Sequence, residues 1–179
     1  MRKEICIAGF GGQGVALVGV ILGKAFALYD NMEAVLTQAY GPEARGGASS
    51  SSLVVSDELI DYPFVQHPDI LVILSQEAYT KFRSDACQDA MIVIDEELVI
   101  PREDDHPFAI PATRLAVELG QRKVANVIML GFLTAITGMV SRKAMEKAIE
   151  TTVKARTVPV NLRAFAVGYE FAAVGEHKR

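Results

Sequence analysis

Short apolar runs alternate with helical patterns over the first two thirds of the chain. Residues 4–8 form an apolar run of strand length, and residues 13–29 then place apolar side chains at three- and four-residue steps, which predicts a helix with one buried face. The same two patterns recur as far as residue 120. We expect further strands at 33–38, 49–55, 69–74, 91–95 and 107–110, helices at 76–82 and from 111 to near 120, and an irregular or edge segment at 60–65.

The last third of the chain is helical in pattern. Asn126 is expected to cap a helix over 127–137, Ser141 to cap one over 142–155, and Pro159 to open a last helix that ends near residue 173. The first of these helices is apolar nearly all round and should be buried, either within the fold or between subunits. The whole pattern predicts one α/β domain over residues 1–179, with an open, mainly parallel, Rossmann-like sheet in three layers and a helical C-terminal third.

Glycines follow the first strand at the spacing Gly9-x-Gly11-x-x-Gly14, which is that of a nucleotide-binding turn. Glycine permits the tight turn and lets a phosphate approach the backbone at the start of a helix. The same spacing also serves as a bare strand-to-helix turn, so both interpretations stay open. A dinucleotide fold would add an acidic residue at the end of the second strand, where this chain has Thr37 and Gln38. This difference disfavours a nicotinamide or flavin ligand.

A second glycine loop follows the second strand at residues 40–47. Pro42 fixes its own backbone angle and restricts Gly41, so the loop has a defined shape. Arg45 stands beside two glycines and suits a carboxylate, a phosphate or a stacked aromatic ring; the alternative is a local ion pair with Glu43. Because both loops follow the carboxyl ends of strands that we expect to be adjacent, they can converge on one crevice.

Composition and charge narrow the class of protein. The 179 residues are half hydrophobic, which fits either a well-filled core or apolar surface buried against other chains. The net charge is −4 and no basic block is longer than the terminal pair Lys178-Arg179, so nucleic acid is not an expected partner. The longest apolar run is too short to span a bilayer and no signal peptide opens the chain, which predicts a soluble cytoplasmic protein without membrane contact.

Patterns for catalysis and metal binding are missing from the sequence. Cys6 and Cys87 lie far apart and cannot hold an iron–sulfur cluster, and the three histidines are isolated from one another. Neither a nucleophile elbow nor a Walker motif occurs. We therefore expect no catalytic residue and no metal site, and candidate chemistry is confined to the two glycine loops.

The two loops together resemble a known family. Gly9-Phe10-Gly11-Gly12-Gln13-Gly14, followed by Thr37-Gln38-Ala39-Tyr40-Gly41-Pro42-Glu43-Ala44-Arg45-Gly46-Gly47, is similar to the gamma subunit of the 2-oxoacid:ferredoxin oxidoreductases, most of all the 2-oxoglutarate type. Pyruvate, branched-chain and indolepyruvate members remain open. The resemblance implies a complex that oxidatively decarboxylates a 2-oxoacid with coenzyme A to an acyl-CoA and CO2 and reduces ferredoxin. It also implies alpha, beta and ferredoxin-like delta partners, which carry thiamine diphosphate and iron–sulfur clusters, and no tightly bound cofactor on this chain.

Within this interpretation the two loops have separate roles. The candidates for cofactor binding are Gly9, Gly11, Gly12, Gln13 and Gly14. The candidates for contact with a partner subunit or coenzyme A are Tyr40, Gly41, Pro42, Glu43, Arg45, Gly46 and Gly47. Two other hypotheses stay open: a purely structural assembly subunit whose turn binds nothing, and a free-standing NAD(P)-dependent dehydrogenase. The isolated chain is expected to be inactive.

Overall fold

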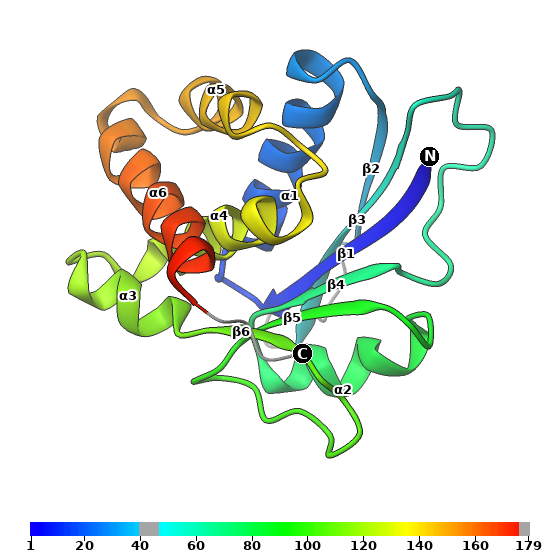
Figure 1. Cartoon of the computed structure of the whole chain (residues 1–179), viewed down its shortest axis with the longest axis horizontal. Helices are drawn as coiled ribbons and strands as arrows, with labels where there is room; N and C mark the ends of the chain where they lie inside the picture. Colours follow the sequence, from blue (N-terminus) through cyan, green and yellow to red (C-terminus); the bar gives the residue numbers. More distant parts are fainter. Residues whose placement is uncertain (40–46, 176–179) are drawn as a thin grey trace.

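The computed structural model describes residues 1–39 and 47–175 and contains one mixed sheet of six strands (Figure 1). The strands are β1 (Arg2–Phe10), β2 (Glu33–Ala39), β3 (Ala48–Ser56), β4 (Ile70–Ile73), β5 (Met91–Asp95) and β6 (Phe108–Ile110), in the order β2-β3-β1-β4-β5-β6. The pairs β1–β4, β4–β5 and β5–β6 are parallel. Only β3 is antiparallel to its two neighbours, β1 and β2. The predicted open, mainly parallel sheet is confirmed.

Helices cover both faces of the sheet. Figure 1 shows α2 (Gln76–Phe82) alone on one face, where it packs over a small apolar cluster. The larger cluster lies on the other face, under α1 (Val15–Lys24), α3 (Ala112–Glu118), α4 (Ala125–Thr137), α5 (Arg142–Thr152) and α6 (Val158–Val174). Because α1 and α2 lie on opposite faces, the chain changes side between the neighbouring strands β1 and β4.

Caps explain several of the predicted helix boundaries. The side chains of Ser75 and Ser141 accept the amides of Ala78 and Ala144, so α2 and α5 begin where the sequence indicated. The first helix differs from its prediction because it begins only at Val15 and ends in a π-helical turn, η1 (Ala25–Tyr29). The segment 57–69 is irregular and forms no strand.

The predicted cap at Asn126 is wrong. A 3-10 turn, η4 (Arg122–Val124), leads directly into α4, so the helix begins before Asn126. The buried Asn126 side chain instead donates to Gly14 O at 3.3 Å and accepts the amide of Val127 at 2.8 Å. It therefore ties the buried helix α4 to the glycine turn, which lies 112 residues earlier in the chain.

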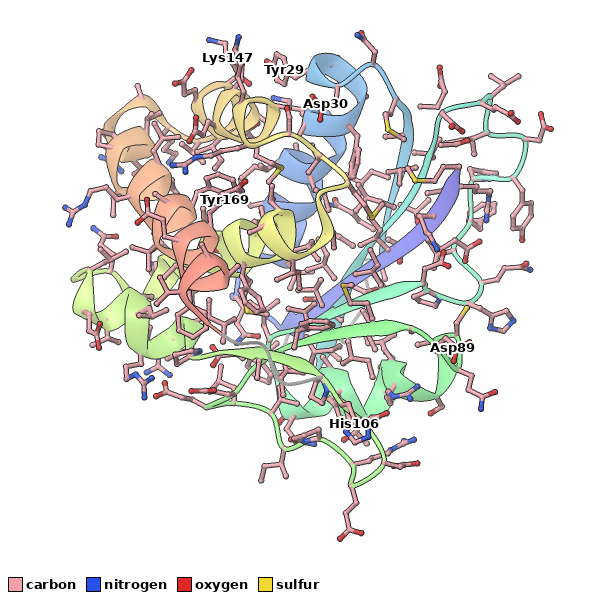
Figure 2. All side chains as sticks on the ribbon, in the orientation of Figure 1. Tyr29, Asp30, Asp89, His106, Lys147 and Tyr169 are labelled. Carbon is pink, nitrogen blue, oxygen red and sulfur yellow. The ribbon has the colours of Figure 1, made fainter. Side chains whose placement is uncertain are left out.

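Two long-range contacts fix the remaining helices. Asp30 accepts both the amide and the hydroxyl of Ser141, at 2.5 and 2.8 Å, and thereby anchors the start of α5 to the end of η1. Figure 2 shows Tyr29 next to Lys147 of α5, on the same side of the molecule. Glycines at the crossing of α4 and α6 let the two backbones touch, because a Cβ on Gly168 would lie 1.9 Å from Ile128 O.

Candidate functional site

The glycine turn after β1 is shaped by left-handed backbone and close packing. Gly12 and Gly14 have φ of 95° and 74°, a region that favours glycine. A Cβ on Gly14 would also lie 2.4 Å from Asn126 Nδ2, whereas one on Gly12 would meet nothing within 4 Å. Gly14 is therefore required by the fold, and Gly12 is the open, exposed point of the turn.

Gln13 connects the end of β1 to the residue that follows β4, where the chain passes from one face of the sheet to the other. Its Oε1 accepts the amide of Phe10 at 2.6 Å and its Nε2 donates to Leu74 O at 2.7 Å. A Cβ on Gly9 would lie 2.7 Å from the same Oε1, so Gly9 makes room for this side chain. Since both polar atoms of Gln13 have protein partners, its side chain acts in this geometry as a positioning group that holds the turn.

Two hollows flank the turn, and Gly12 lines both. We call the first the β2–β3 hollow; it has about 290 Å³. It is lined by Gly11, Gly12, Gly14, Val15, Ala16, Gln38, Ala39, Ser49 and Ser50. We call the second the β5–α4 hollow; it has about 340 Å³. It is lined by Gly12, Gln13, Leu74, Asp95, Leu98, Thr113, Arg122, Lys123, Ala125 and Asn126.

The residues at the two ends of the second loop lie near the β2–β3 hollow. Six candidate contact residues lie outside the described residues: Tyr40, Gly41, Pro42, Glu43, Arg45 and Gly46. Gly47 is described and directly precedes β3, whose first residue Ala48 pairs with Phe10. The other end of the loop follows Ala39, which pairs with Ser50. Both ends therefore stand beside the glycine turn.

The strands that carry the two loops are not adjacent, which corrects the expectation from the sequence. β3 lies between β1 and β2 and runs antiparallel to both. The small side chains in the serine-rich half of β3 let α1 approach the strand closely. A Cβ on Gly19 of α1 would lie only 2.6 Å from Ser51 Cβ, and the Ser51 hydroxyl donates to Val15 O at 3.1 Å. Both loops still leave from the carboxyl end of the sheet, because β1 and β2 run in the same direction.

The end of β2 is not built for a dinucleotide ribose. The side chain of Gln38 donates to Ala16 O at 3.0 Å and to the Ser51 hydroxyl at 3.2 Å, which ties β2 to α1. Thr37 donates to Ser52 O at 3.4 Å. Among the residues that the structure describes, no acidic side chain stands at this end of β2, and β3 separates the end from the glycine turn. The dehydrogenase hypothesis therefore has no support in the described geometry.

The two cysteines do not form a redox centre. Burial raises the pKa of the Cys6 thiol to about 12, so it stays protonated at neutral pH. Cys87 lies elsewhere, with its Sγ 3.1 Å from His67 O. In the part of the chain that the structure describes, no group of three His, Cys, Asp or Glu could hold a metal ion, so these residues do not fit an iron–sulfur cluster. Nor is any helix there long and apolar enough to cross a membrane.

Sequence reasoning missed the β5–α4 hollow because its walls come from five separate stretches of the chain. Thr113 follows β6, and Arg122 and Lys123 belong to η4, just before α4. The only signal in the sequence was the basic pair in front of an apolar helix. Its position beside the glycine turn depends on the Asn126–Gly14 contact, which no local pattern predicts.

Comparisons with known proteins agree with this architecture. Residues 4–171 match the family model described as pyruvate ferredoxin/flavodoxin oxidoreductase, and the chain belongs to this family. It is 55% identical over 177 residues to the 2-oxoglutarate synthase subunit KorC of Methanocaldococcus jannaschii, covering 96% of this chain and 95% of the relative.

Solved structures show the same fold. The gamma subunit of a keto/oxoacid ferredoxin oxidoreductase from Geobacter sulfurreducens superposes with a TM-score of 0.86 at 38% identity, and 97% of each chain is covered. A 2-oxoglutarate:ferredoxin oxidoreductase from Magnetococcus marinus also gives 0.86, at 20% identity, over 99% of this chain but only 32% of its own. The second likeness shows the fold alone, here as one part of a longer chain.

Proposed function

We propose that this chain is the gamma subunit of a cytoplasmic 2-oxoglutarate synthase. The complex would oxidatively decarboxylate 2-oxoglutarate with coenzyme A to an acyl-CoA and CO2 and pass the electrons to ferredoxin. The observation that carries this proposal is the 55% identity, over nearly the whole length of both chains, to a subunit of that name. Thiamine diphosphate and iron–sulfur clusters belong to companion subunits in such complexes, which agrees with the lack of cluster ligands among the described residues.

For the two glycine loops we propose contact with coenzyme A. We also propose that this end of the sheet faces the alpha, beta and ferredoxin-like delta subunits. Three features support this role. Gly12 is exposed and unobstructed, no side chain caps the N-terminus of α1, and a hollow lies between the turn and both ends of the second loop. An uncapped helix start attracts an anionic group, and phosphate is the anion that such glycine turns bind.

A second candidate is a subunit that contributes structure alone. The observation in its favour is that Gly9, Gln13 and Gly14 are each explained by packing inside this chain. Under this hypothesis Gly12 would be a turn residue without a ligand, and the loop at 40–47 would be only an interface.

Coenzyme A titrated into the purified complex and into the lone chain separates the two candidates. Gly12→Ala adds a methyl group at the open point of the turn and strains a positive φ. Gly138→Ala is the matched control, because Gly138 also has a positive φ and open space but ends α4 on the C-terminal side. We expect Gly12→Ala and Arg45→Ala to weaken coenzyme A binding about tenfold or more, and Gly138→Ala to leave it unchanged.

Two results would contradict the proposal. Binding of coenzyme A that neither Gly12→Ala nor Arg45→Ala weakens would favour the structural subunit. Turnover of 2-oxoglutarate by the lone chain would exclude the subunit assignment altogether, because the described residues offer no redox centre.

A further inference from the structure

The β5–α4 hollow lies where open α/β sheets bind their ligands. It sits at the carboxyl ends of β1, β4 and β5, at the point where the chain changes from one face of the sheet to the other. Gln13 and Leu74, joined by the hydrogen bond from Gln13 Nε2 to Leu74 O, line the hollow together with the apolar Leu98. The hollow is therefore a preformed space with both apolar and polar lining.

The positive charge at this hollow lacks a partner. Arg122 and Lys123 are both exposed, and within residues 1–39 and 47–175 neither makes an ion pair. They stand directly before α4, which has no acidic residue in its first turn and no side-chain cap at Val124. The start of a helix disfavours cations, so two of them at this position accumulate positive charge where the fold itself does not need it.

Hydrogen bonds within the chain already occupy both oxygens of the carboxylate that lines the hollow. Asp95 is fully buried, and its Oδ2 accepts the amide and the hydroxyl of Thr113 at 2.9 and 2.6 Å. Its Oδ1 accepts the amide of Glu97 at 3.1 Å. The exposed carboxylates of Glu96 and Glu97 lie 3.8 Å from Arg114. The two cations of η4 are thus available to an incoming anion.

We propose that the β5–α4 hollow is a phosphate-binding subsite, in which Arg122 and Lys123 hold the phosphorylated nucleotide end of a ligand that crosses the glycine turn at Gly12. The inference rests on the proposed coenzyme role of the turn. Gly12 lines both hollows, so an elongated ligand can place its phosphates against η4 and extend its other end toward the second loop. Guanidinium and ammonium groups in front of a helix N-terminus are suited to phosphate oxygens.

The test uses the purified complex, with coenzyme A, adenosine 3′,5′-bisphosphate and pantetheine as probes in calorimetric titrations. The double variant Arg122→Gln/Lys123→Gln is expected to weaken binding of coenzyme A and of the bisphosphate at least tenfold. Binding of pantetheine, which has no phosphate, should be unchanged. The control Lys143→Gln/Lys154→Gln removes the same charge from exposed positions in and after α5 and should change none of the three affinities.

A measurement on the unaltered protein covers the case in which the double variant does not fold. Photolabelling with an azido-adenosine bisphosphate is expected to modify residues 95–98 or 122–126, and coenzyme A should compete with it. Labelling elsewhere, or undiminished affinity for coenzyme A and the bisphosphate in a folded double variant, would overturn the subsite but leave the coenzyme role of the turn intact. If the complex binds the bisphosphate but not coenzyme A, the subsite stands and the coenzyme role fails; if it binds neither, both fail.

Discussion

Glu4 is a nearly buried carboxylate that joins the first strand to the irregular segment 57–69. It accepts hydrogen bonds from Arg2 Nη1 at 2.6 Å and from the amides of Gln66 and His67 at 2.7 and 3.0 Å. Burial alone would raise the pKa of Glu4, but these three hydrogen bonds outweigh it and lower the pKa below the ordinary value of 4.5. The charged form is therefore part of the folded structure.

Glu4→Gln is expected to destabilise the protein by roughly 1–3 kcal/mol at pH 7, because the amides of Gln66 and His67 lose a charged acceptor. A group with a lowered folded-state pKa stabilises the protein above its unfolded pKa and loses that contribution as pH falls through the folded value. The difference between wild type and variant should therefore narrow below about pH 4.5. Urea unfolding at a series of pH values measures it, and an equal difference at all pH values would contradict this account.

Cys6 and Cys87 should react at very different rates. The pKa of about 12 leaves almost no Cys6 thiolate at pH 8, and the side chain is buried in β1. Iodoacetamide is expected to modify Cys87 alone in the folded protein and both thiols in urea, as read by mass spectrometry. A Cys87→Ser variant serves as the control and should take up no label when folded. Rapid labelling of Cys6 would show that β1 opens locally.

At the scale of whole elements, the crossing of α4 and α6 depends on glycine. A Cβ on Gly168 would meet Ile128 O at 1.9 Å, and one on Gly131 would meet Phe165 O at 2.1 Å. Both obstacles are backbone atoms, which cannot rotate away. Gly168→Ala is therefore expected to separate the helices and to lower the free energy of unfolding by at least about 2 kcal/mol.

Gly23→Ala is the matched control for that substitution. Gly23 is also a helix-interior glycine, but a Cβ there would meet only Leu53 Cδ2, at an ordinary 3.4 Å. Its expected effect is a slight gain of stability, because alanine is the better helix former by about 0.5–1 kcal/mol. Chemical denaturation of both variants decides the matter, and equal effects would mean that the two helices adjust without cost.

Asp30 is the corresponding link between η1 and α5. Removal of its carboxylate in Asp30→Ala leaves the amide and the hydroxyl of Ser141 without their acceptor, so we expect a loss of about 1–2 kcal/mol. The exposed Asp61 in the irregular segment provides a control in Asp61→Ala, which should be neutral. Thermal unfolding compares the two, and a neutral Asp30→Ala would mean that water replaces the link.

Elements with local signals could be predicted from the sequence. Ser75 and Ser141 mark their helices by caps, and the apolar runs at β4 and β5 mark strands that are covered on both faces. The direction of β3 could not be predicted, since a serine-rich strand pairs equally well either way. The role of Asn126 was hidden for a similar reason: its sequence position suits a cap, and only the tertiary contact to Gly14 shows otherwise. The candidate site was predicted at the turn but not at η4.

At the scale of the whole molecule, the outer surface of the first helix is the clearest place for a partner chain. Ala16, Leu17, Ala27 and Leu28 are all exposed along α1 and η1. An apolar helix face of this kind normally lies buried. In the longer chain from Magnetococcus marinus the same fold accounts for only 32% of the length, so there it is joined to further domains. Because companion subunits are expected for this chain, we expect one of them to cover this face.

Two substitutions on this face locate the interface. Leu17 is 37% exposed beside the glycine turn, and Leu28 is 62% exposed at the other end of the helix. If the partner covers the edge with the two glycine loops, Leu17→Glu buries an unpaired charge in the interface and should weaken assembly with the companion subunits at least tenfold. Leu28→Glu adds the same charge at the far end and should leave assembly unchanged. Co-purification and sedimentation of the reconstituted complex measure both; if Leu28→Glu alone blocks assembly, the partner binds the opposite end of the sheet and the glycine loops do not lie at the interface.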